Sequence, residues 1–365
     1  MIPLNIPEIS GNEWKYIKEC LDTNWVSSAG SYVDLFENRF GEYIGAKKAI
    51  VTVNGTAALH LALISMGVHE GDEVIVPSLT FIATVNAIRY AGAIPVFVDV
   101  CRDTFVMDAE KVEELVTDKT KVIMPVHIYG HPVDMDPLMD IAARHDLFVI
   151  EDATESLGSK YKGRYTGTIG HTGCFSFNGN KLITTGGGGM LVTNDSALGE
   201  KVKYLSCQAK TVLENGGFDH EEIGYNYRMP NLLAAMGTAQ LEKIDTFIAN
   251  KRRSAAHYTE LLSKVENVTC PVERPWAENV HWLYSAVIEK GFPVSRDELI
   301  KILRDGGVES RPFFTPVHHM KPFMDFPRGS MDVTDELAVR GINLPSSVSL
   351  TYEQIETVVN LISQV

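Results

Sequence analysis

The first candidate for chemistry is a single lysine in the stretch FSFNGNKLITTGGGGM, which runs from residue 175 to residue 190. Lys181 follows an apolar run of strand length and precedes a run of four glycines, and Ser176 lies shortly before it. An amine at the end of a buried strand loses hydration and becomes the neutral nucleophile that a Schiff base requires. Glycines let the backbone approach a bound ring closely. We therefore predict that Lys181 is the reactive amine of an enzyme.

A second candidate is the small-residue turn Asn54-Gly55-Thr56-Ala57, which follows an apolar strand and runs directly into a helix. Gly55 permits close approach to a ligand, Thr56 offers a hydroxyl, and the free N–H groups of the helix start, Ala57 included, suit a phosphate. A helix N-cap alone would explain the same residue types. The turn by itself leaves both interpretations open.

Two carboxylates, Glu151 and Asp152, follow the apolar strand at residues 147–150. A buried acid needs a cation or a set of hydrogen-bond donors, so Asp152 is a candidate partner for a positively charged group. The alternative is helix capping by Asp152, and Glu155, three residues on, would complete a capping box.

Together these residues match the needs of pyridoxal phosphate. Its aldehyde takes a lysine, its ring nitrogen needs a carboxylate, its phosphate needs N–H and hydroxyl donors, and its ring face needs a stacking partner. In that order the sequence offers Lys181, then Asp152, then Gly55, Thr56 and Ser176, and finally Phe81. Phe81 follows a predicted strand, and taken alone it would be interpreted as a core residue.

Apolar runs of strand length alternate with helical periodicity over roughly the first 240 residues. Successive strand and helix pairs are residues 49–53 and 57–66, 73–76 and 82–90, and 94–98 and 109–116. Buried strands separated by helices predict an α/β layer with a mostly parallel sheet, whose ligands bind beyond the carboxyl ends of the strands. Helical residues 244–265, 296–305 and 352–362 with a strand at 282–288 predict a smaller α+β unit. We predict a large domain of residues 1–245 and a small domain of residues 246–365.

Composition excludes several classes of partner. The formal net charge is -14, whereas nucleic acids and anionic membranes recruit basic surfaces. The short cluster Lys251-Arg252-Arg253 is interpreted as part of a solvated helix face. The five cysteines are scattered and form no CxxC pair, which indicates neither a disulfide framework nor a zinc knuckle. With no signal-peptide pattern and no long apolar run, we expect a cytoplasmic protein.

Four motifs make the sequence resemble the DegT/StrS-type sugar-nucleotide aminotransferases, a family of fold type I pyridoxal phosphate enzymes. They are Asn54-Gly55-Thr56-Ala57-Ala58-Leu59, Glu151-Asp152-Ala153, Phe175-Ser176-Phe177 with Gly179-Asn180-Lys181, and Gly224-Tyr225-Asn226-Tyr227-Arg228. The resemblance covers nearly the whole chain and implies a central, mostly parallel seven-stranded sheet with a smaller C-terminal α+β domain. The opening IPEISGNEWKYIKECLDTNWVSSAGSYVDLFE resembles the branch that makes 4-amino sugars for nonulosonic acids such as legionaminic acid.

The resemblance also implies roles at the cofactor. Lys181 would form the Schiff base, Asp152 would pair with the ring nitrogen, and Glu155 would lie near the 3-hydroxyl. Phe81 would stack on the ring, and the phosphate ligands would be Gly55, Thr56, Ala57 and Ser176. Asn226 would reach the phosphate of the other subunit, which implies a homodimer with shared active sites.

On the substrate side, the resemblance places Arg228 near the substrates and His318 in a loop that approaches the sugar. The residues that would line the nucleotide-sugar pocket are Asn24, Trp25, Ser27 and Ser28. At Asn178 the family often has histidine or an aromatic residue, and this difference bears on which sugar is accepted. Gly187 departs from the usual Thr-Thr-Gly-Glu-Gly-Gly, which puts the rigidity of that loop in doubt. His127 and His131 have zinc-like spacing, but Gly130 and Pro132 deny them a helix, so we predict no metal.

These observations predict a pyridoxal phosphate-dependent transaminase that moves an amino group from L-glutamate to C4 of a 4-keto-6-deoxy nucleotide sugar. The expected sugar is the UDP-linked 2-acetamido form. Two alternatives are a dehydratase on the same fold and a non-catalytic sugar-nucleotide sensor. Lys181 argues against the dehydratase, since the resemblance places histidine there in those enzymes.

Overall fold

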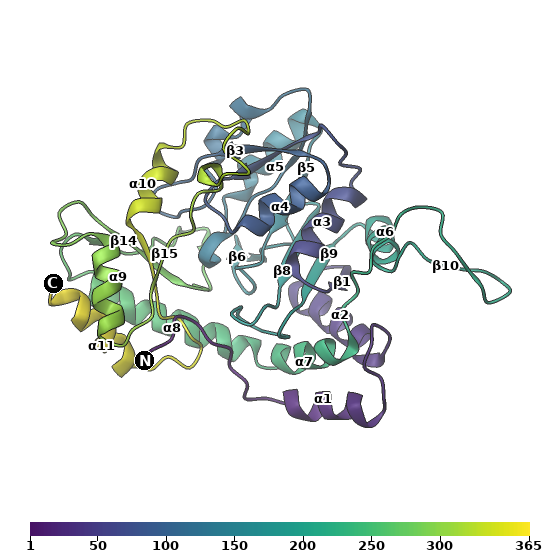
Figure 1. Cartoon of the computed structure of the whole chain (residues 1–365), viewed down its shortest axis with the longest axis horizontal. Coiled ribbons are helices and arrows are strands. Elements are labelled where there is room, and N and C mark those ends of the chain that lie inside the picture. The colour runs from purple at the N-terminus through teal and green to yellow at the C-terminus, as the bar shows by residue number, and fades with distance from the viewer.

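The computed structural model describes residues 1–365 and is built around one sheet of seven strands (Figure 1). In spatial order they are β1 (Lys48–Thr52), β9 (Gly189–Thr193), β8 (Thr172–Ser176), β5 (Phe148–Asp152), β4 (Thr120–Ile123), β2 (Glu73–Pro77) and β3 (Ile94–Val98). The two pairings that involve β9 are antiparallel, and the other four are parallel. The predicted α/β class with a mostly parallel seven-stranded sheet is confirmed.

Helices cover both faces of this sheet. One face carries α3 (Gly55–Ser65), α4 (Ile82–Tyr90) and α6 (Ser196–Ser206), and the other carries α2 (Ser31–Ile44), α5 (Met135–His145) and α7 (Asn231–Leu241). Side chains alternate between the faces along a strand, so Val74 and Val76 join the apolar core under α3 and α4, whereas Ile75 joins the core on the α5 side. The strands are therefore buried on both sides, as their continuous apolar runs indicate.

The local sequence determines where several helices begin or end. The side chain of Asn54 accepts a hydrogen bond from the N–H of Ala57 at 2.7 Å, which caps α3 directly after β1. Helix α2 stops at Gly45, whose φ of 74° is left-handed. The predicted helix at residues 109–116 forms two 3-10 turns instead, η1 (Ala109–Lys111) and η2 (Glu113–Leu115), because its amides donate to carbonyls three residues back.

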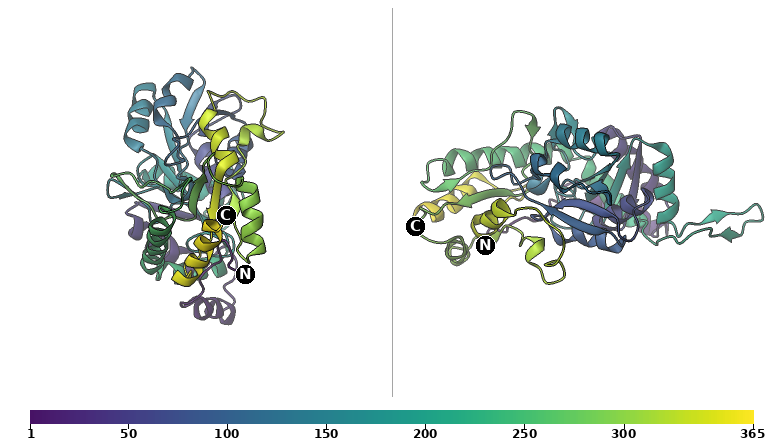
Figure 2. Two further views of the ribbon diagram at one scale, coloured as in Figure 1. Left: turned by 90° about the vertical axis from the view of Figure 1, so that its left-hand side faces the viewer. Right: turned by 90° about the horizontal axis from the view of Figure 1, so that it is seen from above.

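A second layer forms from the C-terminal part of the chain. Its four-stranded antiparallel sheet has the order β12 (Val268–Thr269), β14 (Tyr284–Ile288), β16 (Gly341–Leu344) and β15 (Arg311–Pro312). Its own apolar core joins this sheet to α8 (Ile244–Leu262), α9 (Arg296–Asp305) and α11 (Tyr352–Ser363). Figure 2 shows this part as a body beside the large sheet.

Two segments cross between the parts of the chain. Ile2 donates its N–H to the carbonyl of Gly307, so the N-terminus lies against the C-terminal unit. In return, Phe97 of β3 donates its N–H to the carbonyl of Pro327. We propose a large domain of residues 1–245 and a small domain of residues 246–365. In this division the N-terminal segment packs on the small domain, and the segment around Pro327 packs on the large one.

The remaining elements are short or peripheral. They are α1 (Glu13–Asp22), α10 (Asp332–Arg340), η3 (Ile128–Gly130), η4 (Val317–His319), the three-stranded sheet of β13 (Ala277–Glu278), β6 (Lys160–Tyr161) and β7 (Arg164–Tyr165), and the hairpin of β10 (Thr211–Val212) and β11 (Phe218–Asp219). The hairpin projects far from the body of the molecule (Figures 1 and 2). No helix combines the length and apolar character needed to span a bilayer.

Candidate active site

Lys181 lies in the loop between β8 and β9, at the carboxyl end of the large sheet. Its side chain is only 13% exposed, and its Nζ lies 3.4 Å from Oε1 of Glu155. The same Nζ stands 3.9 Å from the centre of the Trp282 ring, within cation–π distance. The amine is therefore enclosed by an acid and an indole, which a solvated surface lysine would not be.

Glu155 is the buried acid beside this amine. Its Oε2 accepts the N–H of Tyr129 at 2.9 Å while Oε1 faces Lys181. Burial raises the pKa of the Glu155 carboxyl, and the nearby Lys181 ammonium opposes that shift. Both oxygens are committed to these partners, so Glu155 does not complete the capping box that we considered.

Asp152 ends β5 and is 2% exposed. Its Oδ2 accepts the hydroxyl of Thr84 at 2.7 Å and its Oδ1 accepts the N–H of Thr154 at 3.1 Å. The second bond closes a local turn, and no helix begins after Asp152, so the helix-capping alternative is wrong. No lysine, arginine or histidine pairs with Asp152, although a buried carboxylate without a cation is costly. The carboxylate is thus suited to hold a cationic N–H.

The predicted phosphate turn is tightly packed where α3 begins. A Cβ added to Gly55 would lie 2.9 Å from Cβ of Ser176 and 3.1 Å from Cγ2 of Thr154. Helix starts leave their first N–H groups without intrahelical partners, and these attract anions. The N–H of Ala57 is taken by the Asn54 cap, so Gly55 and Thr56 supply the free amides at this point.

Phe81 lies just before α4, and its interpretation as a core residue is wrong because its side chain is 55% exposed. Its ring faces that of Phe314 at 5.7 Å, and Phe314 stacks at 5.5 Å on Tyr129, the residue that donates to Glu155. A chain of contacts therefore joins Phe81 to Lys181 across three loops.

Several substrate candidates lie apart from this group. Arg228 is buried in an ion pair with Glu37 at 2.5 Å, on the helix α2 side of the sheet. Asn226 is exposed beside Cys207, and none of its side-chain atoms bonds within this chain. The exposed loop between α1 and α2 contains Asn24, Trp25, Ser27 and Ser28, and none of them forms a hydrogen bond with the Lys181 side chain. Their roles in binding substrate stay predictions.

The two remaining candidates have different surroundings. Asn178 is exposed, and its backbone N–H approaches Oγ of Ser176 at 3.4 Å, so it stands at the rim of the phosphate turn. His318 is 6% exposed and points away from solvent: its Nδ1 lies 2.6 Å from Oγ of Ser78. His318 is therefore a structured residue behind the β2 loop, and its predicted approach to a sugar stays untested.

A further lysine, Lys251, supports the site from behind. We interpreted it as solvated, but it is buried, and its Nζ donates to the carbonyl of Trp282 at 2.7 Å, to the carbonyl of Ser346 and to Oδ1 of Asn5 at 3.2 Å. The carbonyl of Asn180 in turn accepts Nδ2 of Asn5 and Nε1 of Trp282. The cluster fixes the residue before Lys181, and no local sequence signal marks its members.

The residues present fit pyridoxal phosphate. The buried Asp152 carboxylate lacks a cation, the Gly55 turn has a cradle that a methyl group would fill, and an enclosed amine lies at Lys181. These features match the ring nitrogen, the phosphate and the aldehyde of the cofactor in turn. At each of these three positions, both the residue type and its surroundings suit the corresponding group of the cofactor.

Comparison with known proteins agrees with this geometry. Residues 7–363 match the model of the DegT/DnrJ/EryC1/StrS aminotransferase family. The chain is 44% identical over 365 residues to a GDP-perosamine synthase of Caulobacter vibrioides, covering 100% of this chain and 98% of that protein. It is 46% identical over 354 residues to one of Escherichia coli O157:H7, covering 97% and 95%.

Among solved structures, the chain resembles a putative sugar aminotransferase, Spr1654 from Streptococcus pneumoniae, in its PLP form, with a TM-score of 0.93 and 25% identity. That match covers 100% of this chain and 98% of the other. The cofactor and the enzyme class expected from the sequence are confirmed: this is a pyridoxal phosphate-dependent enzyme. The chain belongs to the DegT/DnrJ/EryC1/StrS aminotransferase family.

Proposed function

We propose that this sugar aminotransferase moves an amino group from L-glutamate to C4 of a GDP-linked 4-keto-6-deoxy sugar. The observation that carries the proposal is the match, over nearly the whole chain, to two proteins named GDP-perosamine synthase. These names favour a GDP-linked sugar over the UDP-linked 2-acetamido sugar that the sequence led us to expect. A relative named as a spore coat polysaccharide biosynthesis protein favours polysaccharide synthesis over the legionaminic acid branch. The base and the sugar are the two points to test.

Bound pyridoxal phosphate would supply an electron sink and carry the amino group between the two substrates. The amides of Gly55 and Thr56 and the hydroxyl of Ser176 would hold its phosphate, and Asp152 would keep its ring nitrogen protonated. Phe81, exposed at the same edge, would cover a ring face.

Lys181 would move the proton between the substrate carbon and the cofactor, because its amine is the enclosed base of this group. Glu155 holds that amine on one side and Trp282 on the other. The two neighbours would restrict its rotamers and exclude bulk water, which keeps the base at one position during transfer.

A second chain would complete the site. Asn226 is exposed, and Val53, directly before the phosphate turn, donates its N–H to the carbonyl of Tyr227. The motif therefore lies beside the phosphate turn but has a free side chain, which supports the proposal that Asn226 serves a neighbouring subunit in a homodimer. Sedimentation with and without cofactor would test this: a fully active monomer would contradict it.

The substrate proposal is tested with glutamate and a matched pair of sugars, one GDP-linked and one UDP-linked, each a 4-keto-6-deoxy sugar. We expect the GDP-linked sugar to gain an amine by mass spectrometry, with at least a tenfold higher kcat/KM. Preference for the UDP-linked sugar would contradict the proposal. A dehydrated product would support the dehydratase, and no turnover of either sugar would support the sensor.

The residue assignment is tested by borohydride reduction of the loaded enzyme and peptide mapping. We expect the label on Lys181. Lys251 is a built-in control, because it is also buried but is bonded to three protein oxygens. Label on Lys251, or on no lysine, would show that the amine assignment is wrong.

A further inference from the structure

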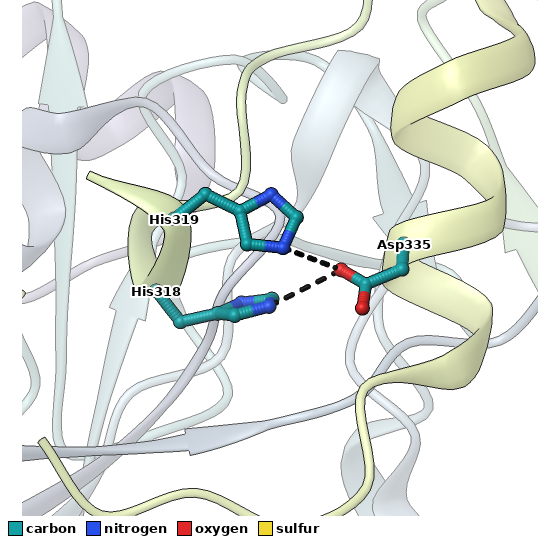
Figure 3. A group of neighbouring side chains, drawn as sticks. All are labelled: His318, His319 and Asp335. Atoms are coloured by element: carbon teal, nitrogen blue, oxygen red, sulfur yellow. Dashed lines mark ion pairs between the residues drawn. The ribbon is translucent and has the colours of Figure 1, made fainter. Parts of the chain in front are cut away.

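Away from Lys181, three side chains form a compact cluster of metal-binding type (Figure 3). His318 and His319 end the turn η4, and Asp335 lies in the first turn of α10. Nε2 of His318 and Nε2 of His319 each lie 3.1 Å from the same oxygen, Oδ1 of Asp335. Figure 3 shows both rings turned toward this carboxylate from one side.

The carboxylate oxygen at the centre of the cluster is not satisfied by hydrogen bonding. Oδ1 of Asp335 is itself buried, although the side chain is 48% exposed as a whole, and it accepts no hydrogen bond; the two ring nitrogens lie within ion-pair distance of it. No lysine or arginine pairs with Asp335. A buried carboxylate oxygen without partners is costly, and in native proteins such an oxygen indicates a bound ion or water.

The spacing suits a small transition metal. Zinc bonds to histidine nitrogen and carboxylate oxygen are about 2.0 to 2.2 Å long. Two such ligands at a tetrahedral angle are therefore roughly 3.3 Å apart. The two nitrogen–oxygen separations of 3.1 Å are close to this value.

An outer partner orients one of the ligands. Nδ1 of His318 lies 2.6 Å from Oγ of Ser78, which also accepts the backbone N–H of His318 at 3.1 Å. Metal-binding histidines characteristically engage their second nitrogen in this way, which fixes the ring and the tautomer.

We propose that His318, His319 and Asp335 bind one Zn²⁺ ion, with the fourth position open to water. The ion would join η4 to α10 and so hold the segment that begins at Phe314, whose ring faces Phe81. We assign it a structural role at the border of the active site, in place of the metal-free protein that the sequence led us to expect.

The test uses untagged, cofactor-loaded enzyme, treated with a chelator and titrated with ZnCl₂ by calorimetry. We expect one Zn²⁺ per chain and a rise in thermal midpoint on binding. His319→Gln should weaken binding at least tenfold. His69→Gln, a change at an exposed histidine outside the cluster, is the matched control and should bind as the parent does.

Cobalt gives a readout that does not depend on stability. Co²⁺ at a tetrahedral nitrogen and oxygen site should produce a visible d–d band in the parent and in His69→Gln, and the band should be lost in Asp335→Asn. If His319→Gln does not fold, Asp335→Asn supplies the zinc measurement. The proposal is wrong if the parent binds no zinc, or if both cluster variants bind zinc as tightly as the parent.

Discussion

The sharpest test of the phosphate turn is Gly55→Ala. The added methyl would stand 2.9 Å from Cβ of Ser176 and 3.1 Å from Cγ2 of Thr154, so these neighbours must shift by a few tenths of an ångström. Gly55 has no left-handed φ, and alanine is the better helix former by about 1 kcal/mol. Overpacking costs about 1 to 3 kcal/mol, which leaves a net destabilisation of roughly 0 to 2 kcal/mol.

The expected effect on cofactor binding is larger than the effect on folding. The methyl would occupy the surface where the phosphate oxygens meet the helix start, and loss of one hydrogen bond to a charged group costs about 1.5 to 3 kcal/mol. That energy corresponds to a roughly 10- to 150-fold weaker Kd for pyridoxal phosphate. Thermal unfolding of the cofactor-free protein should change by only a few degrees.

Absorbance titration of cofactor-free protein with pyridoxal phosphate measures this Kd. The matched control is Gly187→Ala, since a Cβ at Gly187 meets nothing within 4 Å and the position also lies in the glycine-rich part of the site. We expect the control to bind within about twofold of the parent. Equal affinities for Gly55→Ala and the parent would refute the assignment of this turn to the phosphate.

Two further predictions concern buried titratable groups. Lys251→Met should lower the thermal midpoint by several degrees and reduce kcat, because the three oxygens that Lys251 binds lose their donor. Each acceptor left buried without a donor destabilises the fold by about 1 to 3 kcal/mol. Lys264→Met, at an exposed position, is the control, and equal midpoints for the two variants would contradict the support role. Burial lowers the pKa of His131 to about 4, below its ordinary 6.5, so the folded state binds fewer protons and stability falls as pH drops from 6.5 to 4. The free energy of unfolding should fall by up to about 3 kcal/mol over this pH range. In His131→Asn, the free energy of unfolding measured with denaturant should depend less steeply on pH. The same pH dependence in the variant and the parent would contradict this prediction.

Sequence periodicity located the elements that have a strong local signal. Residues 82–90 and 296–305 were predicted as helices with the bounds that α4 and α9 have, and α9 carries a capping box from Ser295 to Glu298. Helix α7 was missed because it is buried on nearly all sides, so its sequence has no amphipathic period. Burial alone does not hide a helix, since α3 is as fully buried and was predicted from the apolar run at residues 57–66 that follows a strand.

The same limit applies to the site. The placement of residues at strand ends, such as Asp152 and Ser176, was predictable because parallel strands bring their carboxyl ends to one edge of the sheet. Trp282 was not, since it meets Lys181 from about a hundred residues further along the chain and lies just before β14, a strand of the other sheet. Lys251 was misassigned because a basic triplet on a helix normally indicates a solvated face.

These unpredicted residues explain why the amine is held where it is. Glu155 lies in the loop after β5 of the large sheet and Trp282 in the C-terminal unit, so the two neighbours of Lys181 come from different parts of the molecule. The carbonyl of Asn180 accepts bonds from Trp282 and from Asn5, and Lys251 binds both of those residues. The reactive position is therefore determined by the packing of the C-terminal unit and the N-terminal segment on the sheet. Any movement between them would alter the surroundings of Lys181, so if Lys181 is the reactive amine that we propose, the small unit takes part in positioning it.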